Sequence, residues 1–253
     1  MSFLDTQEKA KKAGMVVKTF PYPQLYQGLE YPRYSHLLTM GETAQVLERC
    51  SESKLLYPVG LQGLSDISDE ESVGSHRQTI HDVSLAQYLT RKIWEDNSLN
   101  IVPLKLDSYS PVDWQSQNPG QLNYWIPLHV SPVFRYMEYS EGGEHYTHYD
   151  APYIDKTNPY IRTLQSGVLY LTSNDVYTRF IEDGQENIPF TKRKLDDWTI
   201  PSTNDQINMA FKSERGSVIV FPHQLAHDVS KHPGGEKRII IRFDIFYQAV
   251  GKV

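Results

Sequence analysis

The spacing of apolar residues changes character near residue 125, and before that point it is helical. Segment 84–97, SLAQYLTRKIWEDN, begins with a predicted Ser84 cap and has an apolar stripe on one helical face. The stripe consists of Leu85, Tyr88, Leu89 and Ile93. Segments 5–14 (DTQEKAKKAG) and 42–50 (ETAQVLERC) predict two further helices, whereas the acidic stretch 64–75 is typical of a solvated loop. The first half of the chain therefore predicts helices and loops.

After residue 125 the pattern becomes short apolar runs separated by turn residues, which predicts β-strands. The runs are VFRYMEY (133–139), HYTHYDAPY (145–153), SGVLYLTS (166–173), GSVIVFP (216–222) and KRIIIRFDIFY (237–247). Several such strands in succession favour an antiparallel sandwich or barrel. We therefore expect a mainly β protein with N-terminal helices, forming a single domain across residues 1–253. Residues 1–125 form its helical and loop support region and residues 126–250 its β core.

The longest predicted strand, Arg238 to Tyr247, separates into two faces by strict alternation. One face is apolar or aromatic and consists of Ile239, Ile241, Phe243, Ile245 and Tyr247. The N-terminal helices are expected to cover it. The opposite face carries Arg238, Ile240, Arg242 and Asp244. Because arginines are rarely buried without anionic partners, this face predicts a buried anion nearby.

Composition and charge narrow the classes of partner. The formal charge of −6 argues against a nucleic-acid partner, because phosphates favour a basic face. Cys50 is the only cysteine, so no intrachain disulfide can form, which fits a reducing compartment. Residues 1–15 lack the apolar core of a signal peptide, and no run approaches the roughly 20 apolar residues that span a bilayer. We expect a cytoplasmic protein with neither a nucleic-acid nor a membrane partner, and its oligomeric state is not readable from the sequence.

The densest cluster of chemically active side chains is GGEHYTHYDAPY, residues 142–153. If HYTHYD is a strand, His148 and Asp150 project from the same face and can hold one ion. A single H-x-D pair is also typical of solvent-facing or hydrogen-bonded strand residues. His145 lies three residues before His148, which in a regular strand places it on the opposite face in a structural or surface role.

A third ligand is expected from another strand, close to a basic residue. His227 follows the run VIVFP at a strand-to-turn position. Arg238 comes eleven residues later, on the polar face of the last strand. His223, four residues before His227, is the competing candidate.

Four ordered elements between about residues 134 and 247 resemble the iron(II)- and 2-oxoglutarate-dependent dioxygenases, specifically the prolyl-4-hydroxylase-like group. The elements are YSEGGEHYTHYD, GVLYLT, FPHQLAH and GGEKR. They correspond to a tyrosine, glycine turn and H-x-D, to the following strand, to F-P-x-x-x-x-H, and to a glycine followed by a basic residue. The F-P-x-x-x-x-H spacing favours His227 over His223. The first 125 residues carry no part of the resemblance.

The resemblance implies a double-stranded β-helix, the jelly roll of cupin-like proteins, with His148, Asp150 and His227 as both the catalytic and the metal-binding residues. Two neutral imidazoles and one carboxylate suit iron(II) and leave positions open for 2-oxoglutarate and dioxygen. The implied reaction hydroxylates an unactivated C–H bond of a small molecule, an amino acid or a peptidyl residue. Succinate and carbon dioxide are released.

Arg238 is the expected partner of the remote carboxylate of 2-oxoglutarate, because a guanidinium can hold a carboxylate by two parallel hydrogen bonds. Members of the family often have this basic residue ten positions after the histidine, which would be Lys237. Alternation favours Arg238, since Lys237 shares its face with apolar residues, and Arg242 is a third candidate. Tyr170 resembles a family tyrosine that binds the same carboxylate, and Tyr139 resembles one near the metal-bound end of the co-substrate. Each could also be an ordinary half-buried strand tyrosine with a satisfied hydroxyl.

Other interpretations of the same residues stay open. Residues 173–213 lack the glycine pair common in relatives, and they predict a strand near 177–181 followed by an extended loop that covers substrate or decorates the surface. A non-redox cupin-type metal-binding protein could use the same fold and triad, although it would not need Arg238 and Tyr170. An oxygenase could also catalyse desaturation or another oxidation instead of hydroxylation. The identity of the substrate is not readable from the sequence.

Overall fold

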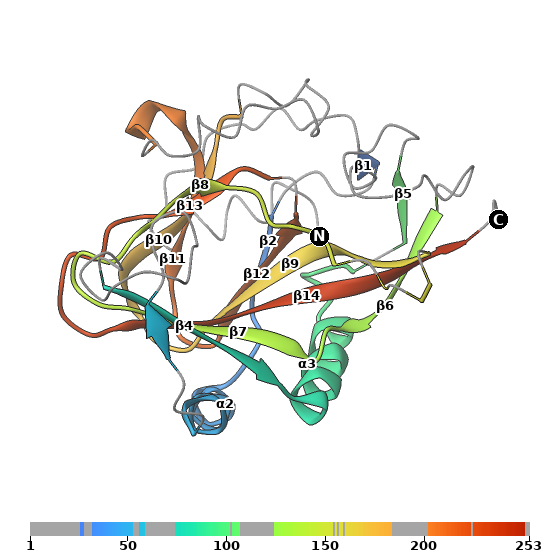
Figure 1. Ribbon diagram of the computed structural model, residues 1–253, viewed down its shortest axis with the longest axis horizontal. Helices are drawn as coiled ribbons and strands as arrows, with labels where there is room; N and C mark the ends of the chain where they lie inside the picture. Colours follow the sequence, from blue (N-terminus) through green and yellow to red (C-terminus); the bar gives the residue numbers. More distant parts are fainter. Residues whose placement is uncertain are drawn as a thin grey trace.

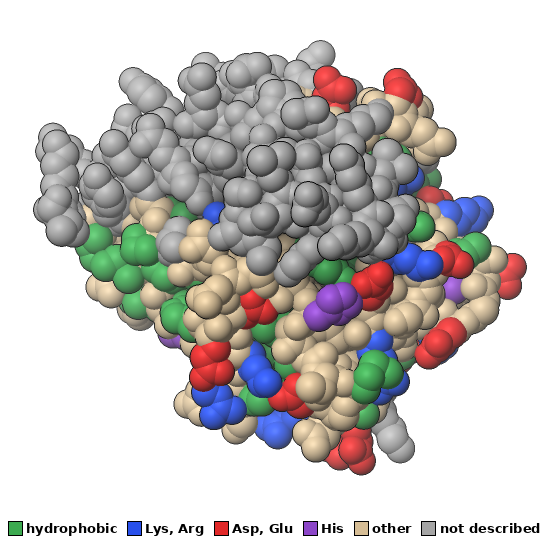
Figure 2. Space-filling model, turned by 180° about the vertical axis from the view of Figure 1, so that it is seen from behind, with side chains coloured by type: hydrophobic (Ala, Val, Ile, Leu, Met, Phe, Trp, Pro, Cys, Tyr) green, Lys and Arg blue, Asp and Glu red, His purple; other side chains and the backbone are tan. Residues whose placement is uncertain are grey.

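The computed structural model describes two antiparallel sheets with two α-helices packed against the outer face of the larger sheet (Figure 1). The described residues are 26–27, 32–52, 56–58, 74–101, 103–106, 124–153, 155, 157–158, 160–183, 202–223 and 225–250. In this part of the chain, neither α-helix has the length and apolar content that a bilayer crossing requires. On the face seen in Figure 2, acidic and basic side chains are interspersed over the described surface.

A jelly roll forms the centre of the molecule. Its strands are β7 (Val133–Tyr139), β8 (His145–His148), β9 (Ile161–Tyr170), β10 (Asn174–Ile181), β11 (Ile207–Ser213), β12 (Ser217–Pro222), β13 (His227–Val229) and β14 (Arg238–Val250). The larger sheet contains the order β7-β14-β9-β12, and the smaller sheet has the order β11-β10-β13-β8. The chain passes repeatedly from one sheet to the other, which is the topology of a double-stranded β-helix. The predicted fold class is confirmed.

Six further strands extend the larger sheet, and most of them precede residue 125. They are β1 (Tyr26–Gln27), β2 (Arg33–His36), β3 (Tyr57–Pro58), β4 (Ser75–His81), β5 (Leu104–Leu106) and β6 (Tyr124–Val130). The prediction that residues 1–125 supply only helices and loops was therefore wrong. These strands are short, and the SHRQTIH sequence of β4 has no apolar alternation. β4 is a strand because its backbone pairs with β7, and its own sequence does not predict this conformation.

The helices are α2 (Met40–Ser51) and α3 (Val83–Glu95), which confirms two of the predicted helices. Thr39 and Glu42 form a capping box at the start of α2. The cap of α3 is Asp82, whose carboxylate accepts from the backbone N–H of Leu85 at 2.9 Å. The predicted Ser84 cap was wrong, because Ser84 already lies in the first helical turn. The predicted helix at 5–14 and the acidic loop through residue 73 lie outside the described residues.

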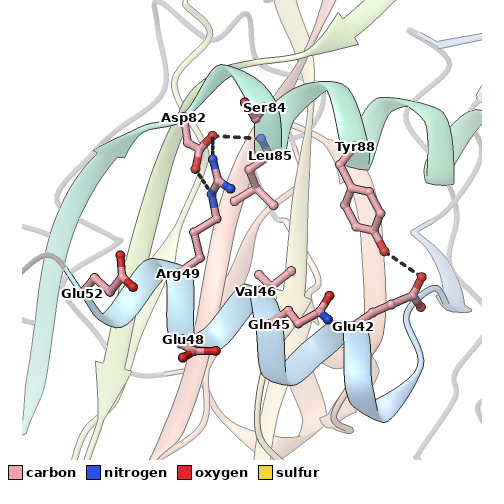
Figure 3. Close-up of a pocket in the computed structure, with 10 residues that line it drawn as sticks. All are labelled: Glu42, Gln45, Val46, Glu48, Arg49, Glu52, Asp82, Ser84, Leu85 and Tyr88. Carbon is pink, nitrogen blue, oxygen red and sulfur yellow. Dashed lines mark hydrogen bonds and ion pairs between the residues drawn. The ribbon is translucent and has the colours of Figure 1, made fainter.

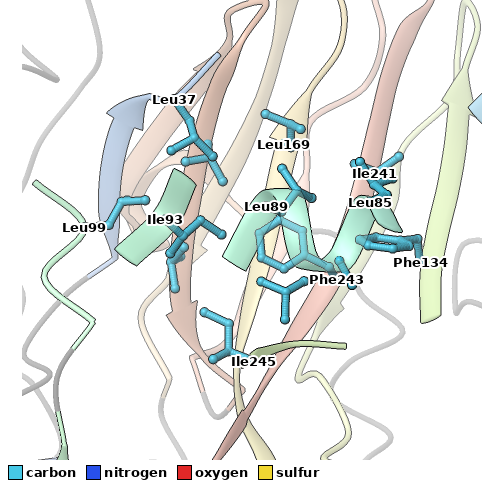
Figure 4. Close-up of a cluster of buried hydrophobic side chains, with 14 of the residues drawn as sticks. Leu37, Leu85, Leu89, Ile93, Leu99, Phe134, Leu169, Ile241, Phe243 and Ile245 are labelled. Atoms are coloured by element: carbon cyan, nitrogen blue, oxygen red, sulfur yellow. The ribbon is translucent and has the colours of Figure 1, made fainter. Parts of the chain in front are cut away.

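The two faces of β14 belong to two different cores. Ile241, Phe243 and Ile245 point outward and are buried beneath the apolar stripe of α3, as Figure 4 shows for Leu89 and Ile93. This confirms that an N-terminal helix covers the apolar face. The residues on the inner face lie between the sheets, in a second cluster that contains Ile240. The alternation of this one strand therefore places its arginines inside the jelly roll.

The segment between β9 and β12 differs from its prediction. The expected strand near residues 177–181 is confirmed and belongs to the longer β10. Strand β11, however, lies within the stretch that was predicted to be an extended loop. Its sequence, INMAFKS, is short and mixed, so pairing with β10 is the only clear sign of its conformation. Residues 184–201 lie outside the described residues.

Candidate functional site

The three residues that the sequence predicts as metal ligands lie together between the sheets. His148 ends β8, and His227 begins β13 directly opposite to it in the antiparallel pair. Asp150 follows His148 by two residues. One ligand atom from each of the three lies within 4.8 Å of the other two, and Nε2 of His227 is 3.8 Å from Oδ2 of Asp150. This arrangement can hold a metal ion.

Hydrogen bonds to the backbone orient both imidazoles for ligation. Nδ1 of His148 lies 2.8 Å from the carbonyl oxygen of Tyr146, and Nδ1 of His227 lies 2.8 Å from that of Leu225. A carbonyl can only accept, so Nδ1 carries the proton and Nε2 keeps its lone pair. Burial lowers the pKa of His148 and of His227 to about 4. Both rings are therefore neutral at pH 7, which is the state that binds metal.

Asp150 is held from several directions. Its side chain is almost buried, with an exposed fraction of 9% for the residue. Nη2 of Arg242 lies 3.0 Å from Oδ1, and the Ser166 hydroxyl donates to Oδ2 at 2.5 Å. The backbone N–H of Asp150 donates to the carbonyl of His223 at 3.0 Å. Burial raises the pKa of the carboxyl group. These contacts fix the orientation of the carboxylate before any ion binds.

His223 lies behind this carboxylate and outside the metal group. It is buried, with 1% of its surface exposed, and its Nε2 is 3.1 Å from Oδ1 of Asp244. Nη2 of Arg242 lies 2.9 Å from the same oxygen. Arg242 therefore bridges Asp150 and Asp244, and His223 contacts the same oxygen of Asp244. Alternation predicted that Arg242 and Asp244 share a face, but it gave no sign of this network.

Arg238 occupies a buried position elsewhere on the inner face of β14. Its guanidinium carbon lies 4.9 Å from the ring centroid of Tyr139 and 5.5 Å from that of Tyr170. Nε donates to Ser213 at 2.9 Å and Nη2 donates to Thr178 at 2.8 Å. Nη1 is buried and has no partner among the described residues. Because a buried cation without an anionic partner is costly, this group is suited to binding an anion.

The competing basic residues are bound to carboxylates. Nζ of Lys237 is exposed and lies 2.7 Å from Oε2 of Glu138, on the other side of the strand. Arg242 holds the two aspartates described above. Of the three basic residues weighed from the sequence, Arg238 is the one without a carboxylate contact in the described part of the chain.

Tyr139 and Tyr170 both lie beside Arg238, on β7 and β9, the two strands that flank β14. Both side chains are fully buried and not half-buried as predicted. The Tyr170 hydroxyl donates to Thr178 at 2.8 Å, next to the Arg238 contact with the same oxygen. Burial raises the pKa of both phenols. They are therefore protonated at pH 7 and can donate hydrogen bonds.

His145 also lies inside the jelly roll, contrary to the prediction for a regular strand. The register pairs His148 with His227 and His145 with Val229, so three steps along β8 match two along β13. Such a β-bulge adds one residue and turns the next side chain to the other face. The His145 ring lies edge-on to His148, with centroids 4.4 Å apart. Sequence alternation could not reveal this, because a bulge interrupts the period on which it depends.

One hollow on the described surface is separate from the metal group. It lies between α2 and α3 and has a volume of about 650 Å³ (Figure 3). Four of its lining side chains contact one another: Arg49 binds Asp82, and the Tyr88 hydroxyl donates to Glu42 at 2.7 Å. None of the residues of the metal group lines it. We therefore attribute this hollow to the packing of the two helices.

No protein-family model matches the chain, and no curated protein matches it. Solved structures similar to the chain are prolyl hydroxylases and other 2-oxoglutarate-dependent oxygenases. A collagen prolyl hydroxylase of Paramecium Bursaria Chlorella virus-1, complexed with 2-oxoglutarate, is 14% identical, with 87% of this chain and 97% of that chain covered and a TM-score of 0.45. A Pseudomonas putida prolyl-4-hydroxylase is also 14% identical, with 87% and 93% covered and a TM-score of 0.45. HygX from Streptomyces hygroscopicus, with nickel and 2-oxoglutarate bound, is 12% identical, with 87% and 83% covered and a TM-score of 0.44.

Proposed function

We propose that the protein is an iron(II)- and 2-oxoglutarate-dependent oxygenase that hydroxylates an unactivated C–H bond. The observation that carries this proposal is the pairing of two features on one inner surface. A group of two neutral imidazoles and one carboxylate lies beside Arg242, and the buried Arg238 lies four residues away on the same face of β14. At about 3.3 Å per residue, the Cα atoms of the two arginines are about 13 Å apart. Arg238 therefore lies further along the same inner face than the arginine that holds the metal-site carboxylate, which is the position expected of an anchor for the far end of a dicarboxylate.

The donor set fits iron(II). His148, Asp150 and His227 supply two nitrogens and one oxygen, the ligand set typical of non-haem iron(II) oxygenases that keep positions open for other ligands. Both imidazoles are already neutral and oriented, so binding requires little rearrangement of these side chains. When bound, iron and 2-oxoglutarate supply the oxidising chemistry, with dioxygen as the oxidant and succinate and carbon dioxide as by-products.

Arg238 supplies the anchor for the remote carboxylate of 2-oxoglutarate. Its unpartnered Nη1 remains available, while Nε and Nη2 are held by hydroxyl groups that cannot neutralise it. The buried rings of Tyr139 and Tyr170 lie against the guanidinium and help to fix its position. A carboxylate bound there forms charge-assisted hydrogen bonds in a dry site, where they are strongest.

A non-redox metal-binding protein is the contrasting possibility, and binding of the co-substrate separates the two. Metal-free protein is titrated anaerobically with iron(II), and 2-oxoglutarate is then added and its heat of binding measured. We expect 2-oxoglutarate to bind tightly only in the presence of metal. Binding of metal without 2-oxoglutarate would instead support the non-redox protein. Arg238→Met serves as the control, because it should keep metal binding and weaken 2-oxoglutarate binding.

The type of oxidation is decided by the product. Iron-loaded protein is mixed with 2-oxoglutarate, oxygen and panels of small molecules, amino acids and proline-containing peptides, and succinate release is measured. Substrates that stimulate succinate release are analysed by mass spectrometry. Hydroxylation adds the mass of one oxygen atom, whereas desaturation removes two hydrogens. A product that lacks two hydrogens would contradict hydroxylation while leaving the oxygenase class intact.

A further inference from the structure

His145 is a buried histidine that the three-residue metal group does not use. Its exposed fraction is 8%, and its Nδ1 atom is buried without a hydrogen-bond partner among the described residues. Both neighbouring histidines of the site, His148 and His227, have Nδ1 satisfied by a backbone carbonyl. Buried polar atoms without partners are uncommon in folded proteins and often mark the place of a ligand. This distinguishes His145 from the two metal-group histidines; His223, whose Nδ1 is also without a partner among the described residues, contacts Asp244 through its other nitrogen.

The bulge in β8 gives His145 its position. Without the extra residue, His145 would face away from the interior, and its burial would have to come from another layer. With it, His145 pairs in register with Val229, while Val229 pairs on its other side with Thr178. Thr178 is the residue that accepts from Arg238. His145 is thus in register, through Val229, with the threonine that contacts Arg238, whereas His148 is in register with His227.

The metal group itself does not include His145. The ligand atoms that approach within 4.8 Å of one another come from His148, Asp150 and His227. The His145 ring instead meets His148 edge-on, at 81° between ring planes. A neutral imidazole in this position offers one N–H donor to a group bound beside the metal.

We propose that His145 binds the co-substrate directly, donating a hydrogen bond to the metal-bound keto acid end of 2-oxoglutarate. This inference rests on the proposed function and adds a second protein contact to it. Arg238 then holds the remote carboxylate, and His145 holds the end that chelates the metal. The two contacts fix the length and orientation of the co-substrate, which favours a five-carbon keto diacid over shorter keto acids.

Binding of 2-oxoglutarate to protein loaded with manganese(II), measured by calorimetry, tests the proposal without turnover. His145→Phe keeps an aromatic ring beside His148 and removes the donor, and we expect it to weaken 2-oxoglutarate binding about tenfold. His145→Gln retains an N–H group and should recover part of that loss. Manganese affinity, measured in the same variants, should stay within about threefold of the wild-type value. Thermal unfolding of each variant checks that it is folded.

A double variant identifies the end of the co-substrate that His145 contacts. If His145 and Arg238 hold opposite ends, the losses from His145→Phe and Arg238→Met should multiply. Losses that do not multiply would place both residues at one carboxylate and overturn the assignment. Equal 2-oxoglutarate affinity in wild type and His145→Phe would also overturn it. Loss of manganese binding in both His145→Phe and His145→Gln would overturn it as well, because it would make His145 a fourth ligand. A wild-type protein that fails to bind 2-oxoglutarate contradicts the proposed function itself, so the two failures are distinguishable.

Discussion

The two faces of β14 meet opposite requirements. The outward face packs Ile241, Phe243 and Ile245 against α3 and contains no charged residue in that stretch. The inward face buries Arg238 and Arg242, each held by polar side chains. Apolar burial stabilises the fold by about 25 cal/mol per Å² removed from water, whereas buried charges cost free energy unless they are paired. The outward side chains of this strand therefore stabilise the fold, whereas its inward side chains belong to the candidate site.

The largest expected effect comes from a metal ligand on the inner side. His227→Ala should abolish manganese(II) binding at concentrations that saturate the wild type, and with it all coupled turnover. His223→Ala should keep measurable activity, because the His223 side chain contacts Asp244 and the backbone carbonyl that Asp150 uses remains; removal of such an outer partner typically costs 10–100-fold in metal affinity. Metal titration of both variants checks this. Loss of metal binding in His223→Ala alone would reverse the assignment of the two histidines.

The outward face should affect stability and leave the site intact. Phe243 is fully buried, and Phe243→Ala should lower the free energy of unfolding by roughly 3–5 kcal/mol through the cavity that it leaves. Urea unfolding measures this loss. Metal and 2-oxoglutarate affinities of the protein that remains folded should be unchanged, which is the control. A change in either affinity would show that the two faces are not separable.

Arg238→Met should have the opposite effect to Phe243→Ala: it should weaken ligand binding and leave stability intact. Loss of a charge-assisted contact is worth about 1.5–3 kcal/mol, so 2-oxoglutarate affinity should fall roughly ten- to a hundredfold while metal affinity stays nearly the same. The free energy of unfolding should be unchanged or higher, because an uncompensated buried charge has been removed. Arg242→Met is the comparison variant. If it weakens 2-oxoglutarate binding and Arg238→Met does not, the wrong arginine has been assigned.

The inner face should also make the metal-free protein sensitive to acid. The pKa of His148 and of His227 is about 4 in the folded protein, below the value of about 6.5 for an unfolded histidine. The contribution of these two histidines to the free energy of unfolding is therefore complete above about pH 6.5 and is lost as the pH falls toward 4. The raised pKa of Asp150 acts with the opposite sign. Urea unfolding between pH 7.5 and 4.5 should show the decline, and His148→Phe should show a shallower one. Equal slopes would contradict the assignment to these histidines.

The smallest expected effect concerns the cap of the helix that covers the outer face. Asp82→Ala removes the acceptor for the Leu85 N–H and should cost about 1 kcal/mol of stability. Ser84→Ala should change stability by less than about 0.5 kcal/mol, since Ser84 does not cap α3. Thermal unfolding of the two variants compares them. A larger loss in Ser84→Ala would restore the cap predicted from the sequence.

The parts of the fold that could be predicted are those whose own sequence repeats a regular period. Strand β14 alternates without interruption from Arg238 to Ile245, so its two faces, with Arg238 buried and Lys237 exposed, could be predicted from the sequence. The face of His145 could not be predicted, because the bulge that sets it is defined by register against β13. Strand β4 was missed for a similar reason: its polar residues form a strand by pairing with β7. The partners of Asp150 come from β9, β14 and the turn after β12, and such distant contacts leave no local trace.

The bridge from Asp150 through Arg242 to Asp244, taken together with Arg238, carries no net charge. Two carboxylates and two guanidinium groups cancel, and the metal-binding histidines are neutral. A divalent cation alone would leave this interior with two uncompensated positive charges, and a dianion alone would leave it with two negative ones. Both together restore balance. The cation and the dicarboxylate should therefore bind cooperatively, each increasing the affinity for the other by the same factor.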